Sequence, residues 1–315
     1  MSLRRDSSGT VPPTEVQWGG WPAYLELSKA RLSALVVLTA AAGFVLASDA
    51  TPQWGRLTWT ALGTAFSAFG VNALNQWLER RRDGLMVRTR ERPLPARRVG
   101  EVHALLWGLG MSAAGLLVLV AAVNGLAASL ALTAELIYIG LYTPLKTRTS
   151  LCTLVGAVCG AIPPMIGWSA AVGSLGTGAW ILGALLFAWQ IPHFLSLAWL
   201  YRDDYARGGF KMLPVFDPSG QTTCRMVVLY SLALLAIGPG AMLTGLTGWV
   251  QGIGSVVLGT GLLLVGVRLY RERTREDARR VFLASLVYLP ALLGLMIADR
   301  SPLFERVVIL ASLDR

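Results

Sequence analysis

The sequence predicts an all-α integral membrane protein that forms one bundle of nine transmembrane helices. The chain of 315 residues is 54% hydrophobic and only 15% charged, and its charged residues gather in a few clusters. Long apolar runs separate these clusters, and each run approaches the roughly 20 residues that a helix needs to cross a bilayer. A segment inside the bilayer must satisfy its own backbone hydrogen bonds, so we expect every run to be helical.

Nine such runs follow one another along the chain, separated by short loops. They cover residues 32–48, 57–78, 103–123, 126–142, 151–171, 179–200, 226–247, 250–269 and 281–298. We interpret the first run as an uncleaved anchor, because eight further apolar runs follow it. We therefore expect a polar N-terminal tail over residues 1–28, a single transmembrane domain over 29–298 and a short C-terminal tail over 299–315.

The basic residues predict the orientation of this bundle. With a cytoplasmic N-terminus, 24 of the 28 lysines and arginines lie on the cytoplasmic side. Basic loops favour that side, so we expect a cytoplasmic N-terminus and an outward C-terminus. The polar loops 79–102, 143–150 and 201–225 then share the cytoplasmic face, where we expect the active site. The net charge of +10 would also suit a nucleic-acid-binding protein. These arginines lie at the ends of membrane segments, however, so no nucleic acid is expected as a partner.

Several common kinds of site have no signature in this sequence. The three cysteines, Cys152, Cys159 and Cys224, have neither the spacing of a metal site nor the even count of a disulfide framework. The chain contains no GxxxxGK phosphate loop and no HExxH or CxxC motif. We therefore look for the function in the polar loops and in the polar residues within the apolar runs.

Three oxygen-bearing side chains recur every four residues at the end of the second apolar run. Asn75, Glu79 and Asp83 would lie in a row on one face of a helix, spread over roughly 12 Å. Such a row suits a hard cation such as Mg²⁺, which binds carboxylates together with phosphate oxygens. Eight arginines whose guanidinium groups suit a diphosphate lie within or just beyond the row: Arg80, Arg81, Arg82, Arg88, Arg90, Arg92, Arg97 and Arg98. The alternative is a basic cytoplasmic loop with a few solvated acids.

Two further cytoplasmic loops carry residues of the same kind. The segment 201–214 contains adjacent carboxylates, Asp203 and Asp204, and a lysine, Lys211. These groups would complete a two-sided clamp for a metal and a diphosphate; the alternative is a helix C-terminus with solvated charges. The loop after the fourth run supplies Tyr142 and Lys146, whose ammonium group is a compact charge for phosphate. Basic residues at a cytoplasmic helix end are also common without any such role.

An acidic residue lies within the fourth apolar run. Glu135 is followed by Tyr138 and Tyr142, three and seven residues later on the same helical face. An ionisable group at this depth normally faces a bundle interior or a water-filled cavity. We expect Glu135 on a cavity wall, the alternative being a protonated side chain that hydrogen-bonds another helix.

The fifth and sixth runs contain residues that perturb helices. Pro163 and Pro164 predict an interruption of the fifth run, which is tolerated where backbone lines a cavity. Gly156 and Gly160 predict close packing of that run on a neighbour. His193 follows a proline in the sixth run, where a helix bends and a backbone carbonyl is freed. It is a candidate to ligate iron, to relay a proton or to cap that carbonyl.

Four segments together resemble the UbiA superfamily of intramembrane prenyltransferases, over roughly residues 25–298. They are NALNQWLERRRDGLMVRTRERPLP (72–95), YTPLKTRT (142–149), GAIPPMIGW (160–168) and FAWQIPHFLSLAWLYRDDYARGGFKMLP (187–214). The superfamily pattern NxxxDxxxD is present with glutamate at its middle position, which keeps an oxygen ligand. In the second superfamily motif, DxxxD, the last acid falls on Asp204 and the first on Leu200. This departure is similar to the branch that farnesylates haem.

The resemblance implies a UbiA-type nine-helix bundle with a cavity open to the membrane lipid. It implies farnesyl diphosphate, bound with Mg²⁺, as the donor and haem b as the acceptor, with a hydroxyethylfarnesyl haem and diphosphate as products. The roles it implies are metal binding by Asn75, Glu79, Asp83 and Asp204 and diphosphate binding by Arg88, Arg92, Lys146 and Lys211. By their positions alone, Tyr138, Tyr142 and Trp189 are candidates to stabilise the carbocation, and His193 is a candidate to position the haem iron. Asp203 would substitute in part for the missing acid, and Glu135 would line the substrate cavity.

The resemblance further implies a haem a synthase acting downstream of this enzyme. We expect the plasma membrane of a bacterium, because the N-terminal segment does not resemble an Arg- and Ser-rich transit leader. Two other classes remain open. A UbiA-type enzyme that prenylates a quinone or chlorophyll precursor predicts an intact second DxxxD motif. A haem- or lipid-binding membrane transporter or assembly factor needs access from both faces, whereas the polar groups here lie on one.

Overall fold

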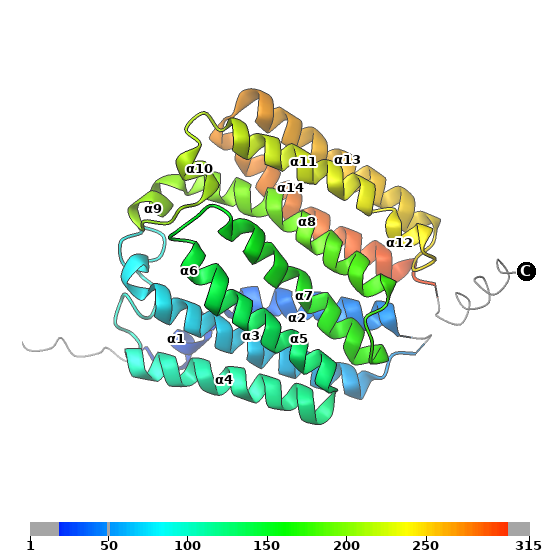
Figure 1. Ribbon diagram of the computed structural model, residues 1–315, viewed down its shortest axis with the longest axis horizontal. Coiled ribbons are helices and arrows are strands. Elements are labelled where there is room, and N and C mark those ends of the chain that lie inside the picture. Colours follow the sequence, from blue (N-terminus) through cyan, green and yellow to red (C-terminus); the bar gives the residue numbers. More distant parts are fainter. Residues whose placement is uncertain (1–18, 49–50, 302–315) are drawn as a thin grey trace, which may run out of the picture.

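The computed structural model describes residues 19–48 and 51–301, which form helices joined by short connections (Figure 1). In chain order these are α1 (Gly20–Leu27), α2 (Ala30–Ala47), α3 (Trp54–Asp83), α4 (Glu101–Ala122), α5 (Gly125–Leu136), the π-helical segment η1 (Ile137–Tyr142), α6 (Thr143–Leu145), α7 (Cys152–Val172), α8 (Thr177–Leu200), α9 (Arg202–Arg207), α10 (Leu213–Phe216), α11 (Gln221–Ile237), α12 (Gly240–Leu243), α13 (Trp249–Glu272) and α14 (Arg275–Ala298). The predicted all-α class is therefore confirmed.

Each predicted apolar run lies in one of these helices or in a consecutive set of them. The fourth run lies in α5 and η1, directly before α6, and the seventh comprises α11 and α12. In the described part of the chain, eight segments are long and apolar enough to cross a membrane. The remaining run lies in α3, whose last turns carry the row of Asn75, Glu79 and Asp83 and three arginines. The count of nine spans and the orientation of the termini remain predictions.

Two groups of helices make up the bundle (Figure 1). Helices α2, α3, α4, α5 and α7 pack on one another in the first group, and α8, α11, α13 and α14 in the second. Helix α8 packs on α7, and α14 also contacts α2, so the two groups meet along these helices. A large cluster of buried apolar side chains fills this junction and includes Leu46, Trp168, Leu185 and Leu292.

The α2–α7 crossing brings two helix backbones into close contact. A Cβ atom added to Gly43 would overlap the carbonyl oxygen of Pro164, and one added to Gly167 would overlap that of Ala40. Only glycine therefore fits at these two positions, because any side chain would force the helices apart. This crossing fixes α2 against the centre of the bundle and so positions the residues at its N-terminal end.

Helix α7 corrects one prediction and confirms another. The interruption expected at Pro163–Pro164 is wrong, because α7 continues through both prolines, which are buried among neighbouring helices. Packing on every side holds the segment helical although two backbone donors are missing. The close packing predicted for Gly156 and Gly160 is confirmed, since a Cβ there would overlap Tyr142 and Gln190.

The chain ends also differ in part from prediction. Helix α1 lies within the segment expected to be a polar tail, and its Ala23 and Leu27 are completely buried. The Tyr24 ring lies 5.1 Å from that of Trp107 in α4, which attaches α1 to the bundle. The rest of the predicted N-terminal tail, residues 1–18, and residues 302–315 of the predicted C-terminal tail lie outside the described residues. The three cysteines are free and buried.

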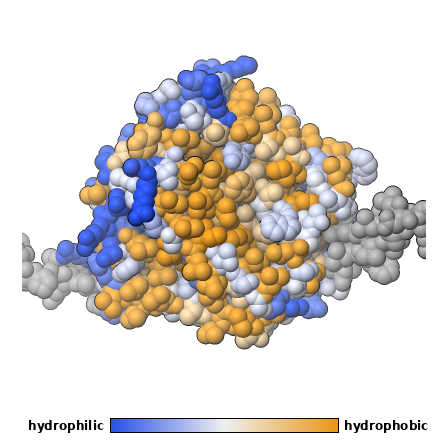
Figure 2. Space-filling model, viewed as in Figure 1, coloured by the Kyte–Doolittle hydropathy of each residue, from blue (hydrophilic) through white to orange (hydrophobic). Residues whose placement is uncertain are grey.

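Hydrophobic and hydrophilic surfaces are separated in the described part of the chain, as the clustering of charged residues in the sequence predicts. Figure 2 shows a broad hydrophobic surface over the middle of the bundle and hydrophilic residues along one end. This end holds α9, α10 and the loop after α3 (Figure 1). A hydrophobic belt of helices with polar ends suits a bilayer, in which apolar side chains face the lipid.

Candidate active site

The last turns of α3 bring the predicted row of polar side chains into the protein interior. Asn75, Glu79 and Asp83 are 0%, 6% and 1% exposed. They lie on one face because four residues correspond to slightly more than one helical turn. The loop 84–100 folds back over the end of the helix, and the Thr89 hydroxyl donates a 2.8 Å hydrogen bond to the carbonyl of Asp83. The alternative of solvated acids in an open loop is therefore wrong.

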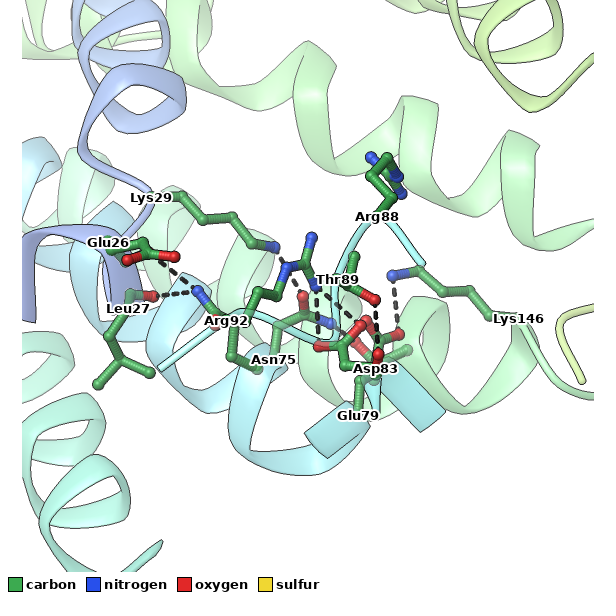
Figure 3. Close-up of polar contacts among 12 residues, drawn as sticks. Glu26, Leu27, Lys29, Asn75, Glu79, Asp83, Arg88, Thr89, Arg92 and Lys146 are labelled. Atoms are coloured by element: carbon green, nitrogen blue, oxygen red, sulfur yellow. Dashed lines mark hydrogen bonds and ion pairs between the residues drawn. The ribbon is translucent and has the colours of Figure 1, made fainter. Parts of the chain in front are cut away.

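Each carboxylate of the row has a basic partner (Figure 3). Lys146 Nζ lies 2.8 Å from Glu79 Oε1, and Arg92 Nη1 lies 2.9 and 2.8 Å from the two carboxylate oxygens of Asp83. Burial alone would lower the pKa of Lys146, but the negative charge of Glu79 outweighs it and raises that pKa. The lysine therefore carries its full positive charge inside the site.

The amide of the row also has a basic partner, Lys29, which connects α1 to α2. Lys29 Nζ donates a 2.9 Å hydrogen bond to Asn75 Oδ1, and Asn75 Nδ2 donates to Thr143 Oγ1 at 3.1 Å. Burial, together with the positive charges of Arg92 and Lys146, lowers the pKa of Lys29 to about 7. The backbone at Lys29 is left-handed, with φ 46°. An uncommon conformation at a non-glycine residue is typical of positions held for function.

A polar cavity of about 280 Å³ lies among these groups, although the buried Asn75 is not on its wall. Seven residues singled out from the sequence line it: Glu79, Asp83, Arg88, Arg92, Tyr138, Tyr142 and Lys146. Sequence reasoning missed Lys29 and Tyr205, which also line it. Lys29 has no motif around it, and its position at the start of a predicted membrane helix was its only signal. Cationic side chains outnumber the carboxylates in this cavity, so it suits an anion that carries several charges.

An apolar cavity of about 260 Å³ adjoins the polar one and shares three of its residues, Leu32, Tyr138 and Tyr142. The π-helical segment η1 places the rings of Tyr138 and Tyr142 5.1 Å apart at this junction. Such segments are frequent at functional sites. Glu135 lies on the wall of the apolar cavity, where its Oε1 accepts a 2.5 Å hydrogen bond from Ser67. Its predicted position on a cavity wall is therefore correct, and it also hydrogen-bonds another helix.

Asp204 lies beside the polar cavity and not on its wall. Its carboxylate accepts hydrogen bonds from the backbone N–H groups of Val87 and Arg88, each at 3.2 Å, and from Arg207. Burial alone would raise the pKa of Asp204, but the hydrogen bonds from Arg207, Arg88 and Val87 outweigh it and lower that pKa. The structure thus connects α9 to the loop after α3 through this carboxylate.

Two other predicted site residues lie apart from both cavities. The Asp203 side chain is 88% exposed and lies 3.7 Å from Arg202. Lys211 is exposed, and its backbone N–H donates to the carbonyl of Lys146 at 2.6 Å. The segment 201–214 therefore supports the site through Asp204 and backbone contacts, whereas its other two predicted side chains point elsewhere.

His193 is part of α8, and its side chain packs against α14, on neither cavity wall. Its ring stacks on Trp189 and on Phe282, with both centroid distances 5.0 Å. Its Nδ1 is 2.9 Å from Ser285 Oγ, and that hydroxyl donates to the carbonyl of Phe282 at 2.6 Å. Because a hydroxyl has one hydrogen, this arrangement makes Nδ1 the donor and leaves the lone pair on Nε2.

The row of α3 has the donor set of a shared magnesium site. Within residues 19–48 and 51–301, no three His, Cys, Asp or Glu side chains lie together in the way that an all-protein metal site requires. Magnesium is more often held by one or two carboxylates and completed by substrate phosphates and water. Glu79 and Asp83, with the Asn75 amide beside them, fit that arrangement.

Comparisons with known proteins agree with this geometry. A model of the UbiA prenyltransferase family matches residues 36–289. A protoheme IX farnesyltransferase of Solibacter usitatus is 42% identical over 286 residues, which cover 88% of this chain and 98% of that protein. A protoheme IX farnesyltransferase of Salinibacter ruber is 44% identical over 276 residues, with the same two coverages.

Solved structures share the fold at low sequence identity. A digeranylgeranylglyceryl phosphate synthase superposes with a TM-score of 0.73 at 15% identity and covers 88% of this chain and 97% of its own. A UbiA homolog from Archaeoglobus fulgidus bound to GPP and Mg²⁺ gives a TM-score of 0.62 at 14% identity, covering 87% of this chain and 99% of its own. The chain therefore belongs to the UbiA prenyltransferase family and, within it, groups with the protoheme IX farnesyltransferases.

Proposed function

We propose that this protein transfers the farnesyl group of farnesyl diphosphate to a vinyl group of haem b, with addition of water, to form haem o and diphosphate. The observation that carries the proposal is the junction of a polar, cationic cavity with an apolar cavity at Tyr138 and Tyr142. An isoprenoid diphosphate has the same two parts, a charged head and an apolar chain. The acceptor is supported by relatives that are 42% and 44% identical and are named protoheme IX farnesyltransferases.

The charged head of the donor would lie among the cations of the polar cavity. Lys29, Arg88, Arg92 and Lys146 supply the positive groups that phosphate oxygens require. The Lys146–Glu79 and Arg92–Asp83 pairs hold both partners in position before any ligand enters. A site that is preorganised in this way stabilises charge without reorganising during the reaction.

Asn75, Glu79 and Asp83 would hold a Mg²⁺ ion beside the diphosphate. When bound, the ion would neutralise part of the charge that develops on the leaving diphosphate. The archaeal UbiA homolog with GPP and Mg²⁺ supports this proposal by its fold. We propose that Asp204 positions the loop after α3, which carries Arg88 and Arg92. Asp203 and Lys211 line neither cavity, and we assign them no role in the reaction.

The reaction begins when the bond between the allylic carbon and the diphosphate oxygen breaks. The diphosphate keeps the electron pair, and the cations around it stabilise the charge. Tyr138 and Tyr142 present aromatic rings at the junction of the cavities, where the allylic cation would form. The vinyl group of haem attacks this cation, water adds to the resulting carbon, and the water gives up a proton.

Several further residues complete the proposal. Glu135 lines the apolar cavity near the expected position of the farnesyl chain. His193 lines neither cavity, and it would support the haem indirectly by stacking on Phe282 rather than by contacting the iron. We place the enzyme in the plasma membrane of a bacterium with the basic end of the bundle in the cytoplasm. A haem a synthase would then consume the product.

The test is an incubation of the purified protein in detergent with haem b, farnesyl diphosphate and Mg²⁺. Mass spectrometry of the extracted haem is expected to find a product heavier by one farnesyl group plus one hydroxyl group, and diphosphate is released in equal amount. The Lys146→Met, Glu79→Gln protein, in which no buried charge is left unpaired, serves as the inactive control. Release of diphosphate with a quinone precursor but not with haem b would overturn the proposed acceptor. No release from any prenyl diphosphate would overturn the enzyme class.

A further inference from the structure

A third cavity, of about 740 Å³, lies between the C-terminal end of α8 and the N-terminal end of α14. One wall is apolar and consists of Leu197, Leu200, Phe282 and Leu283, while Arg275, Glu276 and Arg279 lie at the charged side. Its volume falls within the range of about 300–1,000 Å³ that is typical of pockets for organic ligands. The mechanism above does not use this cavity.

This third cavity borders the site of the reaction. Tyr201 lines it, and the guanidinium of Arg88, which lines the polar cavity, lies 4.9 Å from the Tyr201 ring centroid. Helix α8 also borders both the apolar cavity and the third cavity. Phe194 lines the apolar cavity, and Leu197, three residues later, lines the third. A ligand in the third cavity therefore lies beside Arg88, one of the residues that would hold the diphosphate of the donor.

The two arginines of this cavity are available to a ligand. The acids near them are already paired, since Glu276 lies 2.6 Å from Arg280 and Asp277 lies 2.9 Å from Arg268. In the described part of the chain, Arg275 and Arg279 form no ion pair with a carboxylate, and both are exposed. They are one helical turn apart, so their guanidinium groups can bind two neighbouring carboxylates at once.

We propose that this cavity binds the acceptor of the reaction, with the two propionate carboxylates of haem b on Arg275 and Arg279. The proposal rests on the proposed function and adds the acceptor site to it. The apolar wall would cover the porphyrin ring, and Phe282 would connect that ring to His193, on which it stacks. The paired carboxylates would keep one edge of the haem at the polar end of the membrane and direct the rest toward Tyr201.

The experiment compares haem b with its dimethyl ester, in which both carboxylates are blocked. Binding to the purified protein is measured from the change in haem absorbance, and KM and kcat are measured for both acceptors. Two variants are compared with the wild type. One is a double variant that combines Arg275→Gln with Arg279→Gln, and the other is the control Arg271→Gln. Arg271 is an exposed arginine at the same end of the bundle that lines none of the three cavities.

We expect the wild-type protein to bind haem b about 10- to 100-fold more tightly than the ester, as for hydrogen bonds between charged groups. The double variant should bind haem b more weakly and the ester as tightly as before, so that the preference is lost. The KM for farnesyl diphosphate should stay the same in every variant, and Arg271→Gln should behave as the wild type. Because both arginines are exposed, these substitutions should leave folding intact, which thermal unfolding checks.

Four outcomes would overturn the proposal. The wild type could bind the ester as well as haem b, or the double variant could keep the full preference. A parallel rise in the KM for farnesyl diphosphate would assign the arginines to the donor. If the variant differed from the wild type only in bilayers with anionic lipid, the arginines would bind lipid head groups. A wild-type protein that binds haem b with the expected preference but forms no product would overturn the proposed function and leave the haem site standing.

Discussion

Lys146 and Glu79 form a nearly buried ion pair at the centre of the site, with Nζ and Oε1 2.8 Å apart. The two side chains are only 12% and 7% exposed, and they connect the residue after α6 to α3 across 67 positions of the sequence. Both groups lose hydration on burial, so each depends on the other for compensation. This pair holds the row of α3 against the tyrosines of η1.

Substituting one partner of this pair should destabilise the protein and inactivate it. Lys146→Met leaves the Glu79 carboxylate buried without its cation, which costs about 3–5 kcal/mol. Thermal unfolding in detergent measures the loss. The double variant Lys146→Met, Glu79→Gln should recover most of the stability, since no charge is left unpaired, and should remain inactive. Recovery of activity in the double variant would exclude both residues from the reaction.

Asp83→Asn should weaken the magnesium dependence of the reaction. The amide keeps the shape of the side chain but removes the charge that would attract the cation, so the Mg²⁺ concentration for half-maximal rate should rise at least about 10-fold. Turnover is measured over a series of Mg²⁺ concentrations. Glu101→Gln serves as the control, because Glu101 pairs with Arg80 outside the cavity. Full turnover of Asp83→Asn at limiting Mg²⁺ would remove Asp83 from the proposed ligands.

Asp204→Asn and Asp203→Asn should differ sharply although the two residues are adjacent. Asp204 holds the backbone of Val87 and Arg88, and an amide cannot accept all of these hydrogen bonds at equal strength. We expect the KM for farnesyl diphosphate to rise about 10-fold in Asp204→Asn, as for the loss of a charged hydrogen bond. Limited proteolysis should cut the loop 84–100 faster. Equal effects of both substitutions would contradict the positioning role.

Asp217 should stabilise the beginning of α11 in a pH-dependent way. Its Oδ2 accepts hydrogen bonds from the Thr223 backbone at 2.7 Å and the Thr223 hydroxyl at 2.9 Å. Burial alone would raise the pKa of Asp217, but the hydrogen bonds from Thr223 and Ser219 outweigh it and lower the pKa below its ordinary value of 3.8. A lowered pKa gives stability that is present above about pH 4 and lost as the pH falls.

The corresponding variant is Asp217→Ala, which should lose about 1–2 kcal/mol near neutral pH, as for other capping residues. The difference from the wild type should shrink below about pH 4, because the wild-type carboxylate is protonated there. Thermal unfolding at several pH values tests both parts. If the stability difference between Asp217→Ala and the wild type stayed constant down to pH 3, it would be due to packing and not to the charge of Asp217.

Gly43→Ala should separate α2 from α7 and destabilise the bundle. The new methyl group would overlap the backbone carbonyl of Pro164, which cannot rotate away as a side chain could. Overpacking of this kind costs about 1–3 kcal/mol. Gly261→Ala in α13 is the matched control, because a Cβ there meets no other atom within 4 Å. Gly261→Ala should be neutral or slightly stabilising. A similar loss of stability in both variants would mean that the cost comes from replacing a flexible glycine and not from the α2–α7 contact.

Much of the fold and part of the site were predictable from local patterns. The apolar runs correspond to helices because backbone hydrogen bonding in a bilayer leaves few alternatives. The four-residue spacing of Asn75, Glu79 and Asp83 places them on one face wherever the helix lies. Local patterns failed at Pro163–Pro164, where neighbouring helices keep α7 continuous. They also failed at residues 20–27, where a short helix docks on α4 through side chains that the sequence does not connect.

The sequence by itself determined the helical class, the polar row of α3 and the concentration of basic residues at the loop ends. These are properties of spacing and composition within short windows. Only the tertiary structure decided that Lys29 would reach Asn75 across 46 positions, that Asp204 would hold the loop after α3, and that His193 would lie outside both substrate cavities. Such contacts depend on how distant helices pack, and packing is set by the complementarity of whole surfaces rather than by any one segment.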